Sequence, residues 1–125
     1  MLGNRDAVAN VAVKDLAVAK RFYADTLGLQ QVGAEADEVA VFKSGNSTLN
    51  VYRSQYAGTN RATAVTWSVG DQIEDVVAKL KAKGVKFEHY DSMGMDIKGD
   101  IHVGHGMKVA WFKDPDGNIL NVIGG

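Results

Sequence analysis

The sequence predicts an α+β fold made of two βαβββ modules in tandem, with eight strands and two helices in all. The main observation is an internal repeat: the segment at 13–29 returns at 69–85, and the segment at 42–51 returns at 112–122. A second observation is that each copy holds one run with helical spacing among several runs that alternate as strands do. Together they predict the same order in both copies, namely a strand, a helix and three strands.

The two copies differ in length. Their first segments are offset by 56 residues and their last segments by 71, so the second copy carries about fifteen extra residues, which fall between 86 and 107. No Pro-rich or Ser-rich linker separates the copies. We therefore predict a single domain over residues 1–125, with module one at about 5–54 and module two at about 62–125.

Each predicted helix has a recognisable beginning and end. Asp15 and Asp71 are expected N-caps, because a short carboxylate side chain can accept from the free N–H groups of the first turn. Glu74 follows Asp71 at the spacing of a capping box. Gly28 and Gly84 are expected to end the helices, since glycine readily adopts the positive φ that a helix C-terminus often needs.

The strand-like runs form two matching sets. In the first copy they are VANVAV, QQVGA, EVAVFK and TLNVY, and in the second they are AVTWSV, VKFEHY, KVAWFK and ILNVI. The run Asp-Pro-Asp-Gly-Asn at 114–118 predicts a tight turn between the last two strands. In that turn Pro115 is preset for the second position, and Gly117 can take positive φ.

Alternation along the strands separates an apolar side, expected to pack on the helices, from a polar side. The polar side collects uncharged groups: Asn10, Thr48, Asn50, Tyr52, Thr66, Ser68 and Asn121. A buried polar group without a partner costs about 1–3 kcal/mol, so this set suits a ligand pocket or a solvated concave surface better than a packed core. The alternative is that these groups only bond neighbouring backbone or water.

Composition excludes several classes of function. The formal net charge is −1, from 14 basic and 15 acidic residues, which leaves no electrostatic signature for nucleic acid or an anionic membrane. Cysteine is absent, so disulfides, a catalytic thiol and thiolate metal ligands are excluded. The first residues lack a signal-peptide pattern, and no apolar run reaches the roughly 18 residues of a membrane span. We therefore expect a cytoplasmic protein.

A resemblance to a known family rests on two motifs, VKDLAVAKRFYADTLGLQ and WFKDPDGNILNVI. The chain resembles the vicinal oxygen chelate superfamily, which includes glyoxalase I, bleomycin-resistance proteins and extradiol dioxygenases. The resemblance covers nearly the whole chain and is more specific for the fold than for the reaction. It implies that the two modules form a curved, eight-stranded mixed sheet around a cavity, usually in a homodimer.

Metal-dependent members of that superfamily hold a divalent ion with His, Gln or Glu from the first and last strands of the modules. By motif, those positions correspond here to Val8, Asn50, Ala64 and Asn121. Valine and alanine have no ligating side-chain atom, and an amide oxygen is a weak, neutral donor. We therefore expect no metal and no other cofactor.

All three histidines lie in or beside the extra segment of the second copy: His89, His102 and His105. His102 and His105 have H-x-x-H spacing, but glycines surround them and no predicted helix fixes their geometry. We expect the stretch from about 91 to 107 to be a mobile loop that covers the pocket, with histidines that are solvated or contact ligand. An unusual metal site is the alternative.

The preferred interpretation is a metal-free protein of the glyoxalase and bleomycin-resistance type that binds a small neutral ligand as a homodimer, with no nucleic-acid or membrane partner. The residues expected to contact the ligand are Asn10, Asn50, Tyr52, Thr66, His102, His105 and Asn121. One alternative is an isomerase or lyase acting on a small oxygenated metabolite, with His102 or His105 as acid–base group or metal ligand. Another is a scaffold that acts only through protein contacts.

Overall fold

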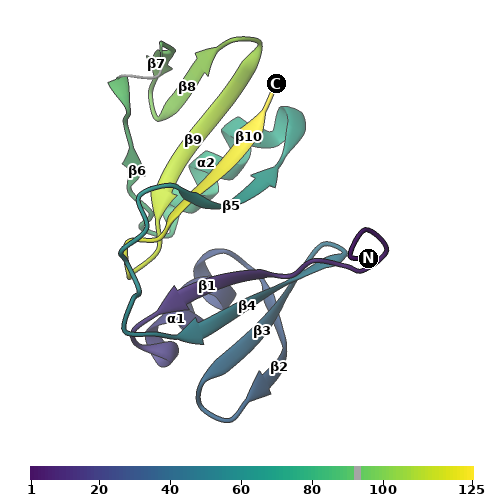
Figure 1. The fold of residues 1–125 in the computed structure, drawn as a ribbon. Coiled ribbons are helices and arrows are strands. Elements are labelled where there is room, and N and C mark those ends of the chain that lie inside the picture. Colours follow the sequence, from purple (N-terminus) through teal and green to yellow (C-terminus); the bar gives the residue numbers. More distant parts are fainter. Residues whose placement is uncertain (92–93) are drawn as a thin grey trace. The chain divides into compact units, whose positions relative to one another are not determined.

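The computed structural model describes residues 1–91 and 94–125, and the chain divides into two compact units, Met1–Gly58 and Thr59–Gly125. Each unit contains one β-sheet and one α-helix (Figure 1). The predicted α+β class is therefore confirmed. The described residues form ten strands in two sheets, whereas we predicted eight strands in one sheet. Two short strands in the extra segment of the second copy account for the higher number of strands.

The first unit follows the predicted order of a strand, a helix and three strands. Its strands are β1 (Ala9–Val13), β2 (Gln30–Glu35), β3 (Val39–Ser44) and β4 (Ser47–Arg53). The helix α1 (Leu16–Arg21) continues directly into a π-helical turn, η1 (Phe22–Thr26). The sheet order is β1-β4-β3-β2, with β1 parallel to β4 and the other pairs antiparallel.

Both predicted ends of the first helix are confirmed. Asp15 is the N-cap, and its Oδ1 accepts from the Val18 N–H at 3.1 Å. Gly28 has φ of +78° after the π-helical turn. The apolar side of the sheet also lies as alternation predicted, since Val11, Val13 and Val51 are buried. The Tyr23 ring is also fully buried, and its centroid is 6.0 Å from that of Phe42.

The second unit has more elements than its counterpart. Its strands are β5 (Thr63–Ser68), β6 (Phe87–Glu88), β7 (Asp96–Lys98), β8 (Ile101–Gly104), β9 (Met107–Lys113) and β10 (Ile119–Gly124). A 3-10 turn, η2 (Gly70–Gln72), leads into the helix α2 (Ile73–Ala82). The sheet order is β5-β10-β9-β8-β7, and β6 also pairs with β9.

The predicted cap of the second helix is wrong. Asp71 lies within η2, and the residue that precedes α2 is Gln72, which makes no side-chain capping bond. The intervening 3-10 turn moves the helix start away from Asp71, and Glu74 instead accepts from Lys108 Nζ at 2.7 Å. The predicted end is confirmed, because Gly84 has φ of +91° and its neighbour Val85 donates to the Leu80 carbonyl at 3.1 Å.

The segment predicted to be a mobile loop contains a hairpin. Residues of β7 and β8 pair antiparallel, and β8 then pairs with the first part of β9 through His102 and Val109. β6 pairs with the last part of β9, at Phe112 and Trp111. Because β10 occupies the other edge of β9, β6 and β8 share one edge, and the short β6 leaves room for the hairpin. Positions 92 and 93 of the predicted loop lie outside the described residues.

The turn predicted at 114–118 is confirmed. Asp114 Oδ1 accepts from the backbone N–H groups of Asp116 and Asn118, at 3.0 and 2.9 Å, and its Oδ2 accepts from Asn118 Nδ2 at 2.8 Å. Gly117 has φ of +89° and donates to the Asp114 carbonyl at 3.0 Å. This turn fixes the register between β9 and β10, which decides which of their side chains share a face.

Among the described residues, no helix is both long enough and apolar enough to cross a membrane.

Candidate functional site

The side of the second sheet that carries Asn121 is the candidate site. Asn121 on β10 lies directly opposite Trp111 on β9 and Thr66 on β5, so these three side chains share one face. The residues between them, such as Leu120 and Phe112, point to the other side of the sheet and are buried there. The predicted placement of Thr66 and Asn121 on the polar side of the strands agrees with this register.

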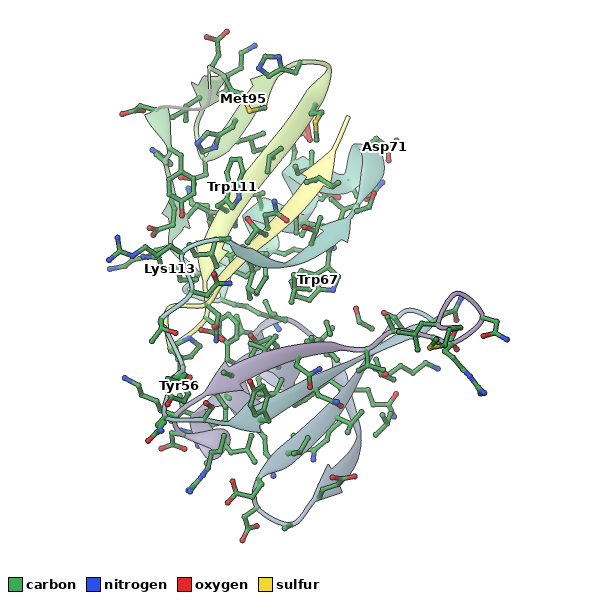
Figure 2. The ribbon with its side chains drawn as sticks, viewed as in Figure 1. Tyr56, Trp67, Asp71, Met95, Trp111 and Lys113 are labelled. Atoms are coloured by element: carbon green, nitrogen blue, oxygen red, sulfur yellow. The ribbon has the colours of Figure 1, made fainter. Side chains whose placement is uncertain are left out.

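Trp111 is the centre of a group of aromatic rings on this face. The His102 ring stands edge-on to it, with centroids 4.8 Å apart and planes at 88°, and Tyr90 does likewise at 5.3 Å and 76°. Trp111 Nε1 donates to Thr63 Oγ1 at 3.1 Å. Figure 2 shows Trp111 partway along β9. We call the residues Thr63, Thr66, Tyr90, His102, Trp111 and Asn121 the Trp111 face.

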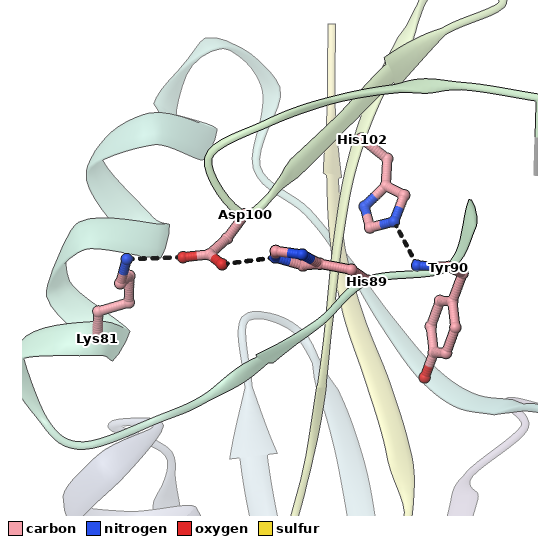
Figure 3. Close-up of polar contacts among 5 residues, drawn as sticks. All are labelled: Lys81, His89, Tyr90, Asp100 and His102. Carbon is pink, nitrogen blue, oxygen red and sulfur yellow. Dashed lines mark hydrogen bonds and ion pairs between the residues drawn. The ribbon is translucent and has the colours of Figure 1, made fainter.

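His102 is fully buried within this group, although we predicted that it would lie on a mobile loop. Its Nε2 accepts a hydrogen bond of 2.9 Å from the Tyr90 backbone N–H (Figure 3). Burial lowers the pKa of His102, assisted by the charge of His89, and outweighs the Val109 carbonyl and the Asp91 carboxylate, which act in the opposite direction. The ring is therefore neutral at pH 7, as an accepting Nε2 requires.

Three buried polar atoms on the Trp111 face have no hydrogen-bond partner: Tyr90 Oη, His102 Nδ1 and Asn121 Oδ1. Within residues 1–91 and 94–125 no other buried side-chain nitrogen or oxygen is left in this state. Burial also raises the pKa of Tyr90, which keeps its hydroxyl protonated. An unpartnered buried polar group costs about 1–3 kcal/mol. Three such groups on the Trp111 face therefore make it the candidate binding site for a ligand with polar atoms.

A second polar group lies beside this face. The Asp100 carboxylate, in the turn between β7 and β8, contacts Lys81 Nζ of α2 at 2.7 Å and His89 Nε2 at 2.8 Å (Figure 3). Lys81 and then His89 lower the pKa of Asp100, so it is charged at neutral pH. The carboxylate joins the hairpin to the helix and to the segment after β6.

The other predicted ligand contacts lie in the first unit. Asn10 and Asn50 are register partners on β1 and β4, and Asn50 Nδ2 donates to Asn10 Oδ1 at 3.3 Å. Asn10 Nδ2 also donates to the Val8 carbonyl at 3.3 Å. Tyr52 is half-buried on β4, opposite Ala12. Asn50 thus donates to Asn10, and Asn10 donates to neighbouring backbone, which is the kind of bond that the alternative interpretation of the polar side allowed.

His105 does not join His102. It is exposed in the turn between β8 and β9, with φ of +52°, whereas His102 is enclosed on the sheet face. The H-x-x-H spacing therefore does not place two imidazoles in one site. Over the described stretches 1–91 and 94–125, no group of three or more His, Cys, Asp or Glu side chains could hold a metal ion.

Two surface depressions in the first unit are weaker candidates. They have volumes of about 440 and 450 Å³ and share Lys14 and Arg53 in their walls. Charges of both signs line them, and Arg53 already pairs with Glu38 at 3.5 Å. Neither contains a buried polar atom without a partner. The Trp111 face is the stronger candidate because its unsatisfied groups are buried.

Sequence reasoning missed Trp111, Tyr90, Thr63 and the contacts of Asp100. The signal for Trp111 was present, because the turn at 114–118 fixes the pairing of β9 with β10 and so sets Trp111 opposite Asn121. The other contacts depend on the hairpin of β7 and β8, which no local sequence pattern predicted.

A comparison with protein-family models identifies the family of this chain. Residues 6–122 match the model described as Glyoxalase/Bleomycin resistance protein/Dioxygenase superfamily. The chain belongs to this superfamily. The resemblance inferred from the two sequence motifs is thereby confirmed. In a comparison with curated protein sequences, none matches significantly.

Solved structures share the fold of this superfamily member at low sequence identity. Lactoylglutathione lyase from Agrobacterium tumefaciens is 18% identical, with 100% of this chain and 96% of that chain covered and a TM-score of 0.73. TnmS3, an antibiotic binding protein from Streptomyces sp. CB03234, is 18% identical, with 99% and 98% covered and a TM-score of 0.73. The fosfomycin resistance protein FosX from Listeria monocytogenes, solved with Mn(II) and sulfate, is 14% identical, with 100% and 92% covered and a TM-score of 0.73.

The superfamily resemblance implies a divalent metal, and the corresponding residues here do not fit one. Val8 and Ala64 have no donor atom in their side chains. Asn50 donates its amide to Asn10, and Asn121 is an amide beside Trp111. Such a set lacks the imidazole and carboxylate donors that iron, nickel and zinc prefer.

Proposed function

We propose that this protein binds a small, neutral organic molecule on the Trp111 face without a metal ion. The observation that carries the proposal is the set of three unpartnered buried atoms: Tyr90 Oη, His102 Nδ1 and Asn121 Oδ1. Indole and phenol rings supply apolar contact area, and the polar atoms supply direction, which is the usual composition of a small-molecule site.

A neutral ligand fits the charge of this face. His102 is uncharged, and the hydroxyl and amide groups around Trp111 are neutral. A charged pair on the same side, Glu88 and Lys113, is 3.5 Å apart, and its two charges neutralise each other. A charged ligand would lose hydration here without gaining an opposite charge, so its binding would be disfavoured.

The fold supports binding without deciding between binding and catalysis. Among similar structures, TnmS3 is an antibiotic binding protein, whereas lactoylglutathione lyase is an enzyme by name. In this chain the absence of donor atoms at Val8 and Ala64 favours a binder over a metal-dependent enzyme. We further propose that it acts in the cytoplasm, and that it forms a homodimer, as the resemblance implies.

A second candidate function is that of an isomerase or lyase. One observation favours it: His102 is a neutral imidazole in a buried site, which is the form needed for a general base. His105, the other histidine considered for this role, is exposed in a turn.

The deciding experiment combines native mass spectrometry and elemental analysis of the purified protein with a ligand screen. Small neutral organic compounds would be screened by NMR for shifts of the Trp111 indole N–H, with the Trp67 indole as an internal control. Binding of the hits to the variants would be measured by calorimetry, because Trp111→Phe removes the reporting indole. Trp111→Phe should abolish binding, and Trp67→Phe should serve as a matched variant that retains it. A stoichiometric divalent metal, or hits that bind Trp111→Phe unchanged, would contradict the proposal.

A further inference from the structure

The hydrogen bonds of His102 determine which of its nitrogens carries the proton. The Tyr90 backbone N–H can only donate, and it points at His102 Nε2 from 2.9 Å. Nε2 must therefore carry a lone pair. Since a neutral imidazole holds one ring proton, that proton lies on Nδ1, and Nδ1 is a donor.

The Nδ1–H group is a donor without an acceptor. His102 has 0% exposure, and its Nδ1 makes no hydrogen bond of acceptable geometry. Val109 is the register partner of His102, and its carbonyl acts to raise the pKa of the His102 ring. The contact nevertheless falls short of hydrogen-bond geometry. Edge-to-face contacts with Trp111 and the bond to Tyr90 hold the ring in place, so it cannot turn to find a partner.

We infer that His102 determines ligand specificity: its Nδ1–H donates to an acceptor atom of the ligand, while its Nε2 holds the segment after β6. This inference rests on the proposed function and narrows it. The ligand class is a neutral molecule with a flat apolar body and a carbonyl-type oxygen. Asn121 Oδ1, which also lacks a partner, can receive an N–H or O–H of the same molecule.

Two substitutions separate the two roles of His102. In His102→Asn the side-chain amide lies near the position of Nδ1, so a donor is kept and the acceptor for Tyr90 is lost. In His102→Gln the longer side chain reaches the position of Nε2, where its oxygen can accept from Tyr90, and the Nδ1 donor is lost. Both variants are polar and close in size, so each is a control for the other.

The probes are acetophenone and α-methylstyrene, which have the same shape but differ in a C=O against a C=CH₂ group. Their binding would be measured by NMR titration of the Trp111 indole. The wild type should prefer acetophenone by about tenfold, the usual scale for one buried hydrogen bond. His102→Asn should keep most of that preference, and His102→Gln should lose it.

Several outcomes would overturn the inference. Equal affinity of the wild type for both probes would refute the hydrogen bond while leaving binding on the Trp111 face intact. An equal preference for acetophenone in His102→Asn and His102→Gln would also refute the hydrogen bond from Nδ1. Long-range ¹H–¹⁵N spectra of the unliganded wild type test the tautomer without any variant, and a proton on Nε2 would refute it. Failure of both probes to shift the Trp111 indole would count against the proposed function itself.

Discussion

The Asp100 carboxylate should stabilise the hairpin of β7 and β8, and Asp100→Ala tests this. The substitution removes the contacts to Lys81 and His89, at 2.7 and 2.8 Å. The Lys81 side chain is 56% exposed and that of Asp100 16%, so solvent screens this pair and limits it to about 1 kcal/mol. The hydrogen bond from His89 adds about 1 kcal/mol. We expect the free energy of unfolding at pH 7 to fall by about 1–2 kcal/mol.

The assay is urea denaturation across pH, with hydrogen exchange of residues 94–104 as a local readout. The pKa of Asp100 is depressed below its ordinary value of 3.8, so its contribution is complete above that value and is lost as the pH falls through the folded pKa. The gap between wild type and Asp100→Ala should therefore close at the acidic end. Exchange in the hairpin should be faster in the variant.

Asp96→Asn is the matched control, because Asp96 is an exposed carboxylate on the same hairpin. It should change the free energy of unfolding by less than about 0.5 kcal/mol. An equal loss in Asp96→Asn and Asp100→Ala, or a gap in unfolding free energy that persists unchanged to the acidic end of the titration, would refute the reasoning. The hairpin would then be held by its backbone pairing alone.

Four further predictions follow. The depressed pKa of His102 means that the unfolded chain binds a proton more readily, so wild-type stability should fall as the pH drops below about 6.5, and His102→Gln should show a flatter profile in thermal melts. Asn121→Leu should keep the fold and weaken binding of a screened ligand by about 1–3 kcal/mol; unchanged affinity by calorimetry would remove Asn121 from the site. Melts with EDTA and with excess nickel, zinc or iron should coincide, and a reproducible rise with one metal would revive the enzyme hypothesis. Light scattering should give the mass of a dimer, and a monomer at high concentration would contradict the proposed assembly.

Much of the fold could be read from the sequence because its signals are local. The cap at Asp15, the positive φ at Gly28 and Gly84, and the turn at 114–118 each depend on residues within a few positions of one another. Strand alternation, which repeats every two residues, correctly placed Asn121 and Thr66 on one side of the second sheet. The repeat then carried this pattern from one copy to the other.

The prediction of the candidate site was less complete, because its contacts join residues that are far apart in the chain. Asn10, Asn50 and Tyr52 were expected in the pocket, and their role stays a prediction. Asp71 was wrongly assigned as a cap, since a 3-10 turn that begins at Gly70 intervenes before α2. Sequence patterns do not reveal whether the first turn of a helix will be a 3-10 turn or an α-helical turn.

By itself, the sequence determined the α+β class, the order of elements and the two sides of each strand, since propensity, capping and alternation act over short distances. Only the tertiary structure decided that residues 96–104 form a hairpin, because that depends on the edge of β9 that the short β6 leaves open. That pairing carries His102 from a glycine-rich segment onto the side of Trp111, and it brings Asp100 within reach of Lys81 and His89. Hydrogen bonds between distant strands have no signature in local sequence, so the buried donor at His102 Nδ1 emerged only once the strands were paired.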